Sequence, residues 1–454
     1  MKYANASSSA LRENNRIDAK YYLSPAMRIK ASIGKSAAVT GSRLGDYAQV
    51  FQPSRFKRVY AVQGESYVPY LRAYDVFDFL PPAADRLSAT RTSKLDSYRI
   101  KPGDILQTCS GRNLGPTTIV DTYLSQFVLS HDMVRIRIAD PTQRHYTLAF
   151  LKSDAGQLLL RSDLNGSVID HITVGQVSNT IIPMIGCVYD EVASLMGDAV
   201  DNRDHARIAL KAATDALNER YPLPKTKLSK GWEVSAARLG SRIDAAAHSE
   251  RVSEIRKTLL ADGGVFIGQI AKVSKPGGRP RLVYVEKDNG TPYLSGRQIL
   301  QTTPIGLKYL SPVSIAANSK YALGEGDVIF QADGRAEESL GYPSMALGER
   351  VGWLASGHVG RFIPHDIKDA GWLWAATACD VVQEQIASSA CGSVVDSVYP
   401  EPLGTMVLPR MSDEESRQVL EAWQMMAKAE ELENRAVRLV DDEMARLRIY
   451  GHSS

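Results

Sequence analysis

The octapeptide IKPGDILQ at residues 100–107 returns as LGEGDVIF at residues 323–330. The two stretches lie 223 residues apart (323 minus 100), and the same spacing joins Gly111-Arg112 to Gly334-Arg335. Internal repeats are considered before local patterns, because a missed repeat leads to the wrong fold. A unit of this length is a whole domain, so we predict a chain built from two tandem copies of one domain.

Each copy is followed by a segment with the periodicity of a long amphipathic helix. Apolar or small residues recur at alternating spacings of four and three over residues 188–216 and again over residues 419–447. This spacing is the heptad seam of a coiled coil, although Glu430 and Glu433 occupy two of the seam positions. We therefore predict that the helices pair as a coiled-coil-like spacer between the domains. The alternative is two separate amphipathic helices, each packed on its own domain.

Within each copy the pattern is mostly that of short strands and turns. Residues 134–138 (VRIRI) alternate apolar and polar side chains, which is typical of a half-buried strand. The predicted fold class is α/β (α+β), with two tandem globular domains that are separated and followed by long helices. The predicted segments are 1–186 for the first domain (1–15 a flexible lead-in), 187–222 for the central helix, 223–411 for the second domain and 412–454 for the C-terminal helix.

Charge is distributed unevenly along the chain. Residues 187–221 contain seven acids and four bases, and residues 412–448 contain ten acids and six bases. These two segments together carry −7, so with a net charge of +3 the remainder carries +10. The helices are therefore acidic and the repeated domains basic. Nucleic-acid phosphate, if it binds this chain, is expected to bind the repeats.

The sequence favours a cytoplasmic protein. It contains no run of about 18 apolar residues, and residues 1–15 lack the apolar core of a signal peptide. The cysteines form no CxxC pair and no Cys/His cluster at metal-ligand spacing, so we expect reduced thiols and no metal site; they are Cys109, Cys187, Cys379 and Cys391.

The patterns of common catalytic sites are missing from the sequence. Residues 33–36 (IGKS) end like a phosphate-binding P-loop, but Ile29 stands where its first glycine is needed. No GxSxG, HExxH, EF-hand or [ND]-P-P-[FY] pattern occurs. His131 and His358 have no nucleophile in a matching place, so we interpret them as structural or as polar loop contacts. We interpret Asp104 and Asp327 as parts of a repeated Gly-Asp turn, and we expect no catalytic residue.

Three short phrases join the duplicated architecture: RFKRVY at residues 55–60, GDIL at residues 103–106 and PYLSG at residues 292–296. Together with the order of the parts, they resemble the specificity (S) subunit of type I restriction–modification systems. The resemblance covers nearly the whole chain, and the duplicated architecture makes it specific, since no single phrase is diagnostic. It implies a non-catalytic subunit whose two target-recognition domains each read half of a split DNA sequence.

The same resemblance implies partners and cofactors. The paired helices would be the docking platform for two methyltransferase (M) subunits, which bring S-adenosylmethionine and methylate adenine at N6. Restriction (R) subunits that use ATP and Mg would join for cleavage and phage defence. The chain itself would contact double-stranded DNA but no membrane, and would hold no cofactor. The helix residues expected to serve partner binding are Val188, Val192, Leu195, Val419, Trp423, Met426, Val437 and Met444.

Basic and amide side chains of the two repeats are the candidate DNA contacts. Arg is the usual reader of guanine and Asn suits adenine, whereas other Lys and Arg side chains hold phosphates. The two Gly-Arg pairs rank first, because each follows the Gly-Asp strand of its repeat. The repeats differ strongly in their loops, so we expect two different half-sites and an asymmetric target. The candidates are Arg55, Lys57, Arg58, Arg72, Arg91, Lys94, Arg112, Asn113, Lys275, Arg279, Arg281, Arg297 and Arg335.

Other functions stay open at this point. The chain could be the DNA-recognition subunit of a different phage-defence or modification assembly that has no methyltransferase partner. It could also be a nuclease that uses scattered acids and histidines, or a protein-only scaffold whose basic surface is incidental. Metal-dependent cutting by the purified chain would favour the nuclease, and salt-insensitive or absent duplex binding would favour the scaffold.

Overall fold

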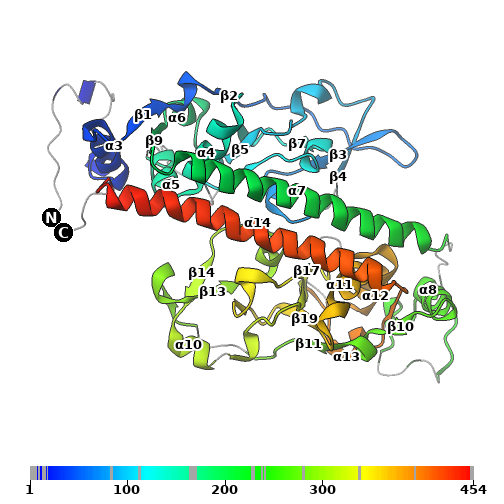
Figure 1. The fold of residues 1–454 in the computed structure, drawn as a ribbon. Coiled ribbons are helices and arrows are strands. Elements are labelled where there is room, and N and C mark those ends of the chain that lie inside the picture. The colour runs from blue at the N-terminus through cyan, green and yellow to red at the C-terminus, as the bar shows by residue number, and fades with distance from the viewer. Residues whose placement is uncertain are drawn as a thin grey trace. The chain divides into compact units, whose positions relative to one another are not determined.

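The structure is a computed structural model, in which the chain divides into two compact units (Figure 1). Unit 1 comprises residues 1–77, 81–204 and 429–454, and unit 2 comprises residues 78–80 and 205–428. The predicted fold class, mixed α/β with two repeats and long helices, is confirmed. The residues described are 8, 11–12, 17, 19–81, 85–110, 114–162, 171–225, 231–236, 239, 242–278, 282–317, 319–335, 339–392 and 395–449.

The core of unit 1 is a four-stranded antiparallel sheet with helices packed on it. Its strand order is β2-β8-β5-β6, formed by β2 (Gln49–Phe51), β8 (Met133–Arg137), β5 (Ile105–Thr108) and β6 (Thr117–Ile119). Helix α4 (Pro141–Lys152) begins after β8, where Asp140 accepts a hydrogen bond from the Gln143 amide at 2.6 Å and Pro141 occupies the first turn. Ile105, Val134 and Ile136 share one apolar core with this helix.

Unit 2 repeats this sheet with the same strand order. The order is β11-β19-β15-β17, formed by β11 (Ala271–Ser274), β19 (Val359–Pro364), β15 (Val328–Gln331) and β17 (Pro343–Met345). The register is also the same: Ile105 pairs with Ile136 in unit 1, and Val328 pairs with Phe362 in unit 2. This shared register assigns each residue near the sheet in one repeat to its equivalent in the other.

A second, smaller sheet lies beside the first in each repeat. In unit 1 its order is β4-β3-β7, formed by β4 (Asp85–Ser88), β3 (Tyr67–Leu71) and β7 (Val128–Leu129). In unit 2 its order is β12-β14-β13-β18, formed by β12 (Tyr284–Val285), β14 (Lys308–Leu310), β13 (Thr291–Leu294) and β18 (Leu354–Ala355). The remaining strand pairs are β1 (Thr40–Arg43) with β9 (Ile181–Met184), β10 (Val265–Phe266) with β21 (Val407–Leu408), and β16 (Asp333–Gly334) with β20 (Asp396–Ser397).

Shorter helices complete each unit. In unit 1 they are α2 (Ala19–Tyr22), α3 (Pro25–Lys35), α5 (Asp154–Leu160) and α6 (Val174–Ser178). In unit 2 they are α8 (Glu250–Ala261), α9 (Ile267–Ile270), α10 (Pro312–Ala317), α11 (Ala370–Ala378), α12 (Asp380–Ser389) and α13 (Pro400–Gly404). Gly371 on α11 allows close helix packing, because a Cβ there would lie 2.0 Å from the Ser416 carbonyl oxygen.

The two long helices, α7 (Tyr189–Arg220) and α14 (Asp413–Arg446), each contribute one part to unit 1 and one part to unit 2. Inside each unit the two helices run antiparallel. In unit 1 Arg435 pairs with Glu191 at 3.0 Å, and in unit 2 Arg220 pairs with Glu415 at 2.6 Å. The hydrogen bond from Arg220 lowers the pKa of Glu415 to about 2.

The predicted seam holds on α14 but only in part on α7. Val419, Trp423 and Met444 are buried on α14. On α7, by contrast, the predicted seam positions Ala209 and Ala216 are exposed. Leu210 and Leu217, each one residue further along, are buried in their place. The prediction was wrong here because alanine fits either face of a helix, so a run of alanines does not fix which face is buried.

A buried ion cluster surrounds Glu433, one of the two glutamates on the predicted seam of α14. Glu433 is 2% exposed and accepts from Arg203 of α7 at 2.8 Å and from Lys152 of α4. Burial alone would raise the pKa of Glu433, but the charges of Arg203 and Lys152 outweigh it and hold that pKa far below its usual value. Burial lowers the pKa of Lys152 despite Glu433, whereas the pKa of Arg203 is raised because the charge of Glu433 outweighs its burial. The cluster joins three helices within unit 1.

Residues 78–80 precede the second strand of the small sheet in sequence, yet they belong to unit 2. The Phe79 amide donates to the Leu300 carbonyl at 2.7 Å, and Arg207 donates to the Phe79 carbonyl at 2.8 Å. The Phe79 ring lies 5.1 Å from the Trp423 ring and 4.6 Å from the Arg350 guanidinium. This short segment is therefore part of the core of unit 2.

The repeated aspartates have the structural role predicted for them. Asp104 accepts from the Lys101 amide at 3.1 Å, and Asp327 accepts from the Gly324 amide at 2.8 Å, so each carboxylate closes its own turn. Among the described residues, no helix has the length and apolar character needed to cross a bilayer. The same part of the chain contains no group of His, Cys, Asp and Glu arranged to hold a metal ion.

Candidate nucleic-acid interface

The Gly334-Arg335 turn of the second repeat begins at β16, which pairs with β20. Gly334 packs against the Gln331 side chain, whose Nε2 donates to the Asp333 carbonyl at 2.8 Å. Arg335 follows directly and is exposed. Its guanidinium makes no hydrogen bond or ion pair with the other residues that the structure describes.

Asp333 directly precedes this turn and is the centre of a polar cluster. Its carboxylate accepts from Lys275 at 2.7 Å, from the Ser397 hydroxyl at 2.5 Å and from Nδ1 of His358 at 2.7 Å. Burial would raise the pKa of Asp333, but the hydrogen bonds from Lys275, Ser397 and His358 outweigh it and lower that pKa below its usual value. Four segments of unit 2 thus meet at one ionised carboxylate.

The first repeat has a related but different cluster at the equivalent place. Ser110 takes the position of Asp333, and its hydroxyl lies 3.2 Å from Nδ1 of His171. His171 bridges to Ser110 as Ser397 pairs with Asp333. Arg112 and Asn113, which follow in the sequence, lie outside the described residues. Each repeat therefore places an exposed imidazole beside the residue that precedes its Gly-Arg pair.

The predicted equivalence of His131 and His358 was off by one residue. Thr108 pairs with Met133 in unit 1, and Gln331 pairs with Val359 in unit 2. Because Thr108 corresponds to Gln331, Asp132 and not His131 is the equivalent of His358. His131 and His358 are 227 residues apart, whereas the spacing between the repeats is 223 at β5 and 226 at β8.

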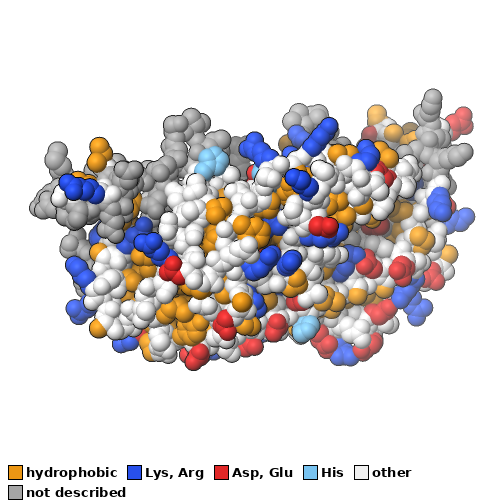
Figure 2. Space-filling view, turned by 90° about the horizontal axis from the view of Figure 1, so that it is seen from above, with side chains coloured by type: hydrophobic (Ala, Val, Ile, Leu, Met, Phe, Trp, Pro, Cys, Tyr) orange, Lys and Arg blue, Asp and Glu red, His pale blue; other side chains and the backbone are white. Residues whose placement is uncertain are grey.

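Exposed tyrosines with a cation over the ring lie on the small sheet of both repeats. In unit 1 the Arg86 guanidinium lies 4.6 Å from the centre of the Tyr67 ring, and in unit 2 the Lys308 ammonium lies 4.7 Å from that of Tyr284. Tyr67 and Tyr284 are each 47% exposed. These pairs were not predicted from the sequence. The pattern that could have indicated them is a tyrosine on one strand and a basic residue on the strand paired with it. On the face drawn in Figure 2, Lys and Arg side chains lie among hydrophobic ones.

Three of the predicted DNA contacts in the first repeat are exposed, and their side chains make no hydrogen bond or ion pair with the described residues: Arg55, Lys57 and Lys94. The other described candidates are engaged within their own unit. Arg72 pairs with Asp85 at 3.1 Å, and Arg91 pairs with Glu65 at 2.6 Å. Arg58 donates to the Tyr70 hydroxyl at 3.3 Å.

The candidates of the second repeat are placed differently. Lys275 is bound to Asp333, and its ammonium lies 4.7 Å from the Tyr399 ring centre, so its charge is compensated. Arg297 pairs with buried Asp78 at 2.5 Å within unit 2. Arg279 and Arg281 lie outside the described residues. Of the described candidates in this repeat, Arg335 alone is free of such contacts.

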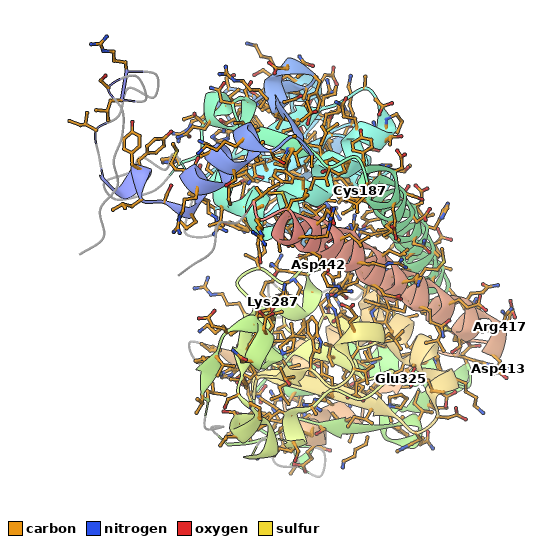
Figure 3. All side chains as sticks on the ribbon, turned by 60° about the vertical axis from the view of Figure 1, so that its left-hand side comes forward. Cys187, Lys287, Glu325, Asp413, Arg417 and Asp442 are labelled. Carbon is orange, nitrogen blue, oxygen red and sulfur yellow. The ribbon has the colours of Figure 1, made fainter. Side chains whose placement is uncertain are left out.

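Most helix residues predicted to serve partner binding are packed inside their own unit. Val192, Val419, Trp423, Met426 and Met444 are at most 2% exposed, so the apolar seam is covered within the chain. Val188, Leu195 and Val437 are half-buried. The outward surface of α14 is instead charged; Asp413 and Arg417 lie at one end of the helix and Asp442 lies toward the other (Figure 3).

Two buried arginines hold equivalent loops and were not predicted as functional or structural. Arg135 is 1% exposed and donates to the carbonyls of Tyr98 and Arg99 at 2.9 Å each. Its equivalent, Arg361, donates to the Ala322 carbonyl at 2.5 Å. Tyr98 in turn donates to the Ser54 carbonyl at 3.0 Å, which fixes the start of the loop that carries Arg55 and Lys57.

We expect Lys57→Ala to weaken duplex binding about equally for target and random sequences. An exposed lysine contributes chiefly by neutralising a phosphate, so the slope of log K against log salt concentration should fall by about 1. Fluorescence titration of a labelled duplex at several salt concentrations measures the slope. An unchanged slope would show that Lys57 does not contact DNA.

Comparison with known proteins gives matches among solved structures. No protein-family model matches the chain, and no curated protein matches it significantly. Among solved structures, the chain is similar to S subunits of type I restriction–modification systems. The S subunit from M. genitalium is 11% identical, with 93% of this chain and 99% of that chain covered and a TM-score of 0.35.

Two further solved structures from type I systems also cover most of this chain. The HsdS subunit from Thermoanaerobacter tengcongensis is 17% identical, with 92% of this chain and 97% of that chain covered and a TM-score of 0.28. A chain from a structure described as showing complex assembly and conformational transition of the type I R-M system is 16% identical, with coverages of 91% and 97% and a TM-score of 0.28.

Proposed function

We propose that this chain is the DNA-recognition subunit of a type I restriction–modification assembly. Each repeat would read one half of a split, asymmetric duplex target. The proposal rests on one observation. The two repeats have sheets with the same strand order and register, but they carry different polar side chains at equivalent positions. Ser110 corresponds to Asp333, and Asp132 corresponds to His358, by the registers of the two sheets. Two domains of one fold can recognise different DNA sequences when their hydrogen-bond donors and acceptors differ at equivalent positions.

Partner subunits would supply the chemistry. The long helices carry an excess of acids, which disfavours contact with phosphate and suits protein partners. We propose that two methyltransferase subunits dock on the charged outer surfaces of α7 and α14. S-adenosylmethionine would belong to those subunits, and ATP and Mg would belong to restriction subunits where the assembly has them. In this proposal the chain itself selects the adenines to be methylated and catalyses nothing.

A comparison of N6-methyladenine across the host genome, with and without the gene, tests this function. We expect loss of modification at one split, asymmetric motif, with both half-sites identified at once. An unchanged pattern together with specific duplex binding by the purified chain would instead favour a DNA-recognition subunit of an assembly without a methyltransferase. Metal-dependent cutting by the purified chain would contradict the non-catalytic role.

We expect Arg335→Ala to weaken recognition of the second repeat's half-site and to leave the other half-site intact. Arg335 is exposed directly after β16. A bidentate contact to guanine is worth about 1–3 kcal/mol of discrimination. Competition binding with duplexes altered in one half-site at a time measures the effect. If both half-sites weaken equally, Arg335 is a phosphate contact. The equivalent change, Arg112→Ala, should affect the opposite half-site.

A further inference from the structure

We propose that His358 is a specificity-determining residue of the second repeat. Its Nε2 atom would accept a hydrogen bond from the exocyclic amine of adenine or cytosine in the major groove. The inference rests on the proposed DNA-recognition function and names a base contact within it. It comes from the Asp333 cluster, which fixes the position of the imidazole and, in the neutral ring, the nitrogen that carries the hydrogen.

The geometry leaves one edge of the His358 ring available. Nδ1 lies 2.7 Å from the Asp333 carboxylate, whereas 73% of the side chain is exposed. Nε2 lies on the side of the ring away from Nδ1, so it faces outward from the cluster. The His358 carbonyl accepts from the Ala332 amide at 2.8 Å, and the His358 amide donates to the Ser356 hydroxyl at 3.3 Å. The residue is therefore held at both its backbone and its ring.

The partner of Nδ1 decides what Nε2 can do. An ionised carboxylate only accepts hydrogen bonds, so Nδ1 must carry the hydrogen that Asp333 receives. In the neutral imidazole Nε2 is then a pure acceptor. Lys275 and Ser397 keep Asp333 ionised by donating to its other oxygen at 2.7 and 2.5 Å. Adenine N6 and cytosine N4 are the amines that the major groove offers to an acceptor.

The position of His358 brings it to the same loop cluster as Arg335. Asp333 binds the His358 ring, and Arg335 follows Asp333 by two residues on the turn. Arginine suits guanine, whereas an imidazole acceptor suits adenine or cytosine. Together the two side chains would read neighbouring base pairs with complementary preferences.

The first repeat supports an asymmetric target rather than a symmetric one. There, an exposed imidazole comes from His171 on the opposite strand, and its Nδ1 meets the Ser110 hydroxyl at 3.2 Å. A hydroxyl both donates and accepts, so it does not fix which nitrogen of His171 carries the hydrogen. Asp132 takes the place of His358 in this repeat. We therefore expect the acceptor preference at this position in the second half-site only.

The test is selection of bound duplexes from a randomised pool by the full-length chain. The wild type should enrich a split motif, and His358→Ala should lose preference for adenine or cytosine at one position of one half-site by roughly two- to tenfold, which is the range expected for one hydrogen bond. His365→Ala is the matched control, because His365 is an exposed histidine at the other end of β19. Thermal unfolding of each variant checks that the fold is retained.

Asp333→Asn separates this role from a merely structural one. An amide can donate to Nδ1, which allows Nε2 to carry the hydrogen and favours guanine or thymine oxygens instead. We expect the preference at that position to shift rather than to vanish. If His358→Ala enriches the same motif as the wild type at every position, the inference about His358 is overturned but the proposed function is not. A wild-type chain that enriches no motif would overturn the proposed function as well.

Discussion

Glu433→Ala is expected to lower the free energy of unfolding by about 3–5 kcal/mol, the range for removing one partner from a buried ion pair. Glu433 is 2% exposed, and its carboxylate is shared by Arg203 and Lys152. Removal of the carboxylate would leave two cations inside unit 1 without their counter-ion. Chemical denaturation followed by circular dichroism measures the change.

Asp442→Ala is the matched control for this variant. Asp442 is an exposed carboxylate on the same helix and in the same unit, so its loss should change the unfolding free energy by about 0.5 kcal/mol or less. An equal, small effect of both substitutions would show that the buried cluster contributes little. In that case hydrophobic packing alone would hold α7 against α14 in unit 1.

The same cluster predicts acid sensitivity of unit 1. The folded pKa of Glu433 lies below its unfolded value, so the stabilisation is complete above the unfolded value of about 4.3 and is lost as pH falls toward the folded one. Wild-type stability should therefore decline below about pH 4.5, and part of that decline should be missing from Glu433→Ala.

Phe79→Ala is expected to destabilise unit 2 by about 3–5 kcal/mol, although residue 79 lies far from the rest of that unit in sequence. The ring is 5% exposed and packs on Trp423 and Arg350. Removal of the Phe79 ring would leave a cavity beside the Trp423 and Arg350 side chains. Hydrogen exchange of unit 2 amides should accelerate in this variant.

Tyr74→Ala serves as the comparison for Phe79. Tyr74 lies five residues earlier in sequence but belongs to unit 1, where it is 37% exposed. Its removal should leave exchange in unit 2 unchanged. Similar protection in Phe79→Ala and the wild type would mean that the segment is not needed for the core of unit 2.

The repeat and the long helices could be predicted from sequence because both are patterns of many residues. The Gly-Asp turns preserve their spacing, and α14 preserves its heptad seam through Val419, Trp423 and Met444. The role of Arg135 could not be predicted in this way. Alternation in VRIRI shows that the arginines share one face, but it does not distinguish a face in water from one that meets loop carbonyls.

Only the part of the candidate site that lies within one short stretch of sequence could be predicted. Arg335 was found because a Gly-Arg pair recurs, and the structure places it, exposed, directly after β16. Asp333, His358 and Ser397 meet there from separate segments, and no spacing in the sequence brings them together. Lys275 was predicted as a DNA contact because it is a lysine in a basic loop. In the structure Lys275 pairs with Asp333, and its contact with DNA stays a prediction.

The segment at residues 78–80 has a consequence for how such a gene could vary. A recombination event within α7 would exchange everything after the first repeat and would supply a new Trp423 and Arg350 from another parent. Phe79 would still come from the original parent and would have to fit that foreign pocket. Inheritance of a new second half therefore depends on a compatible aromatic residue encoded in the first half, so the two halves are not freely interchangeable modules.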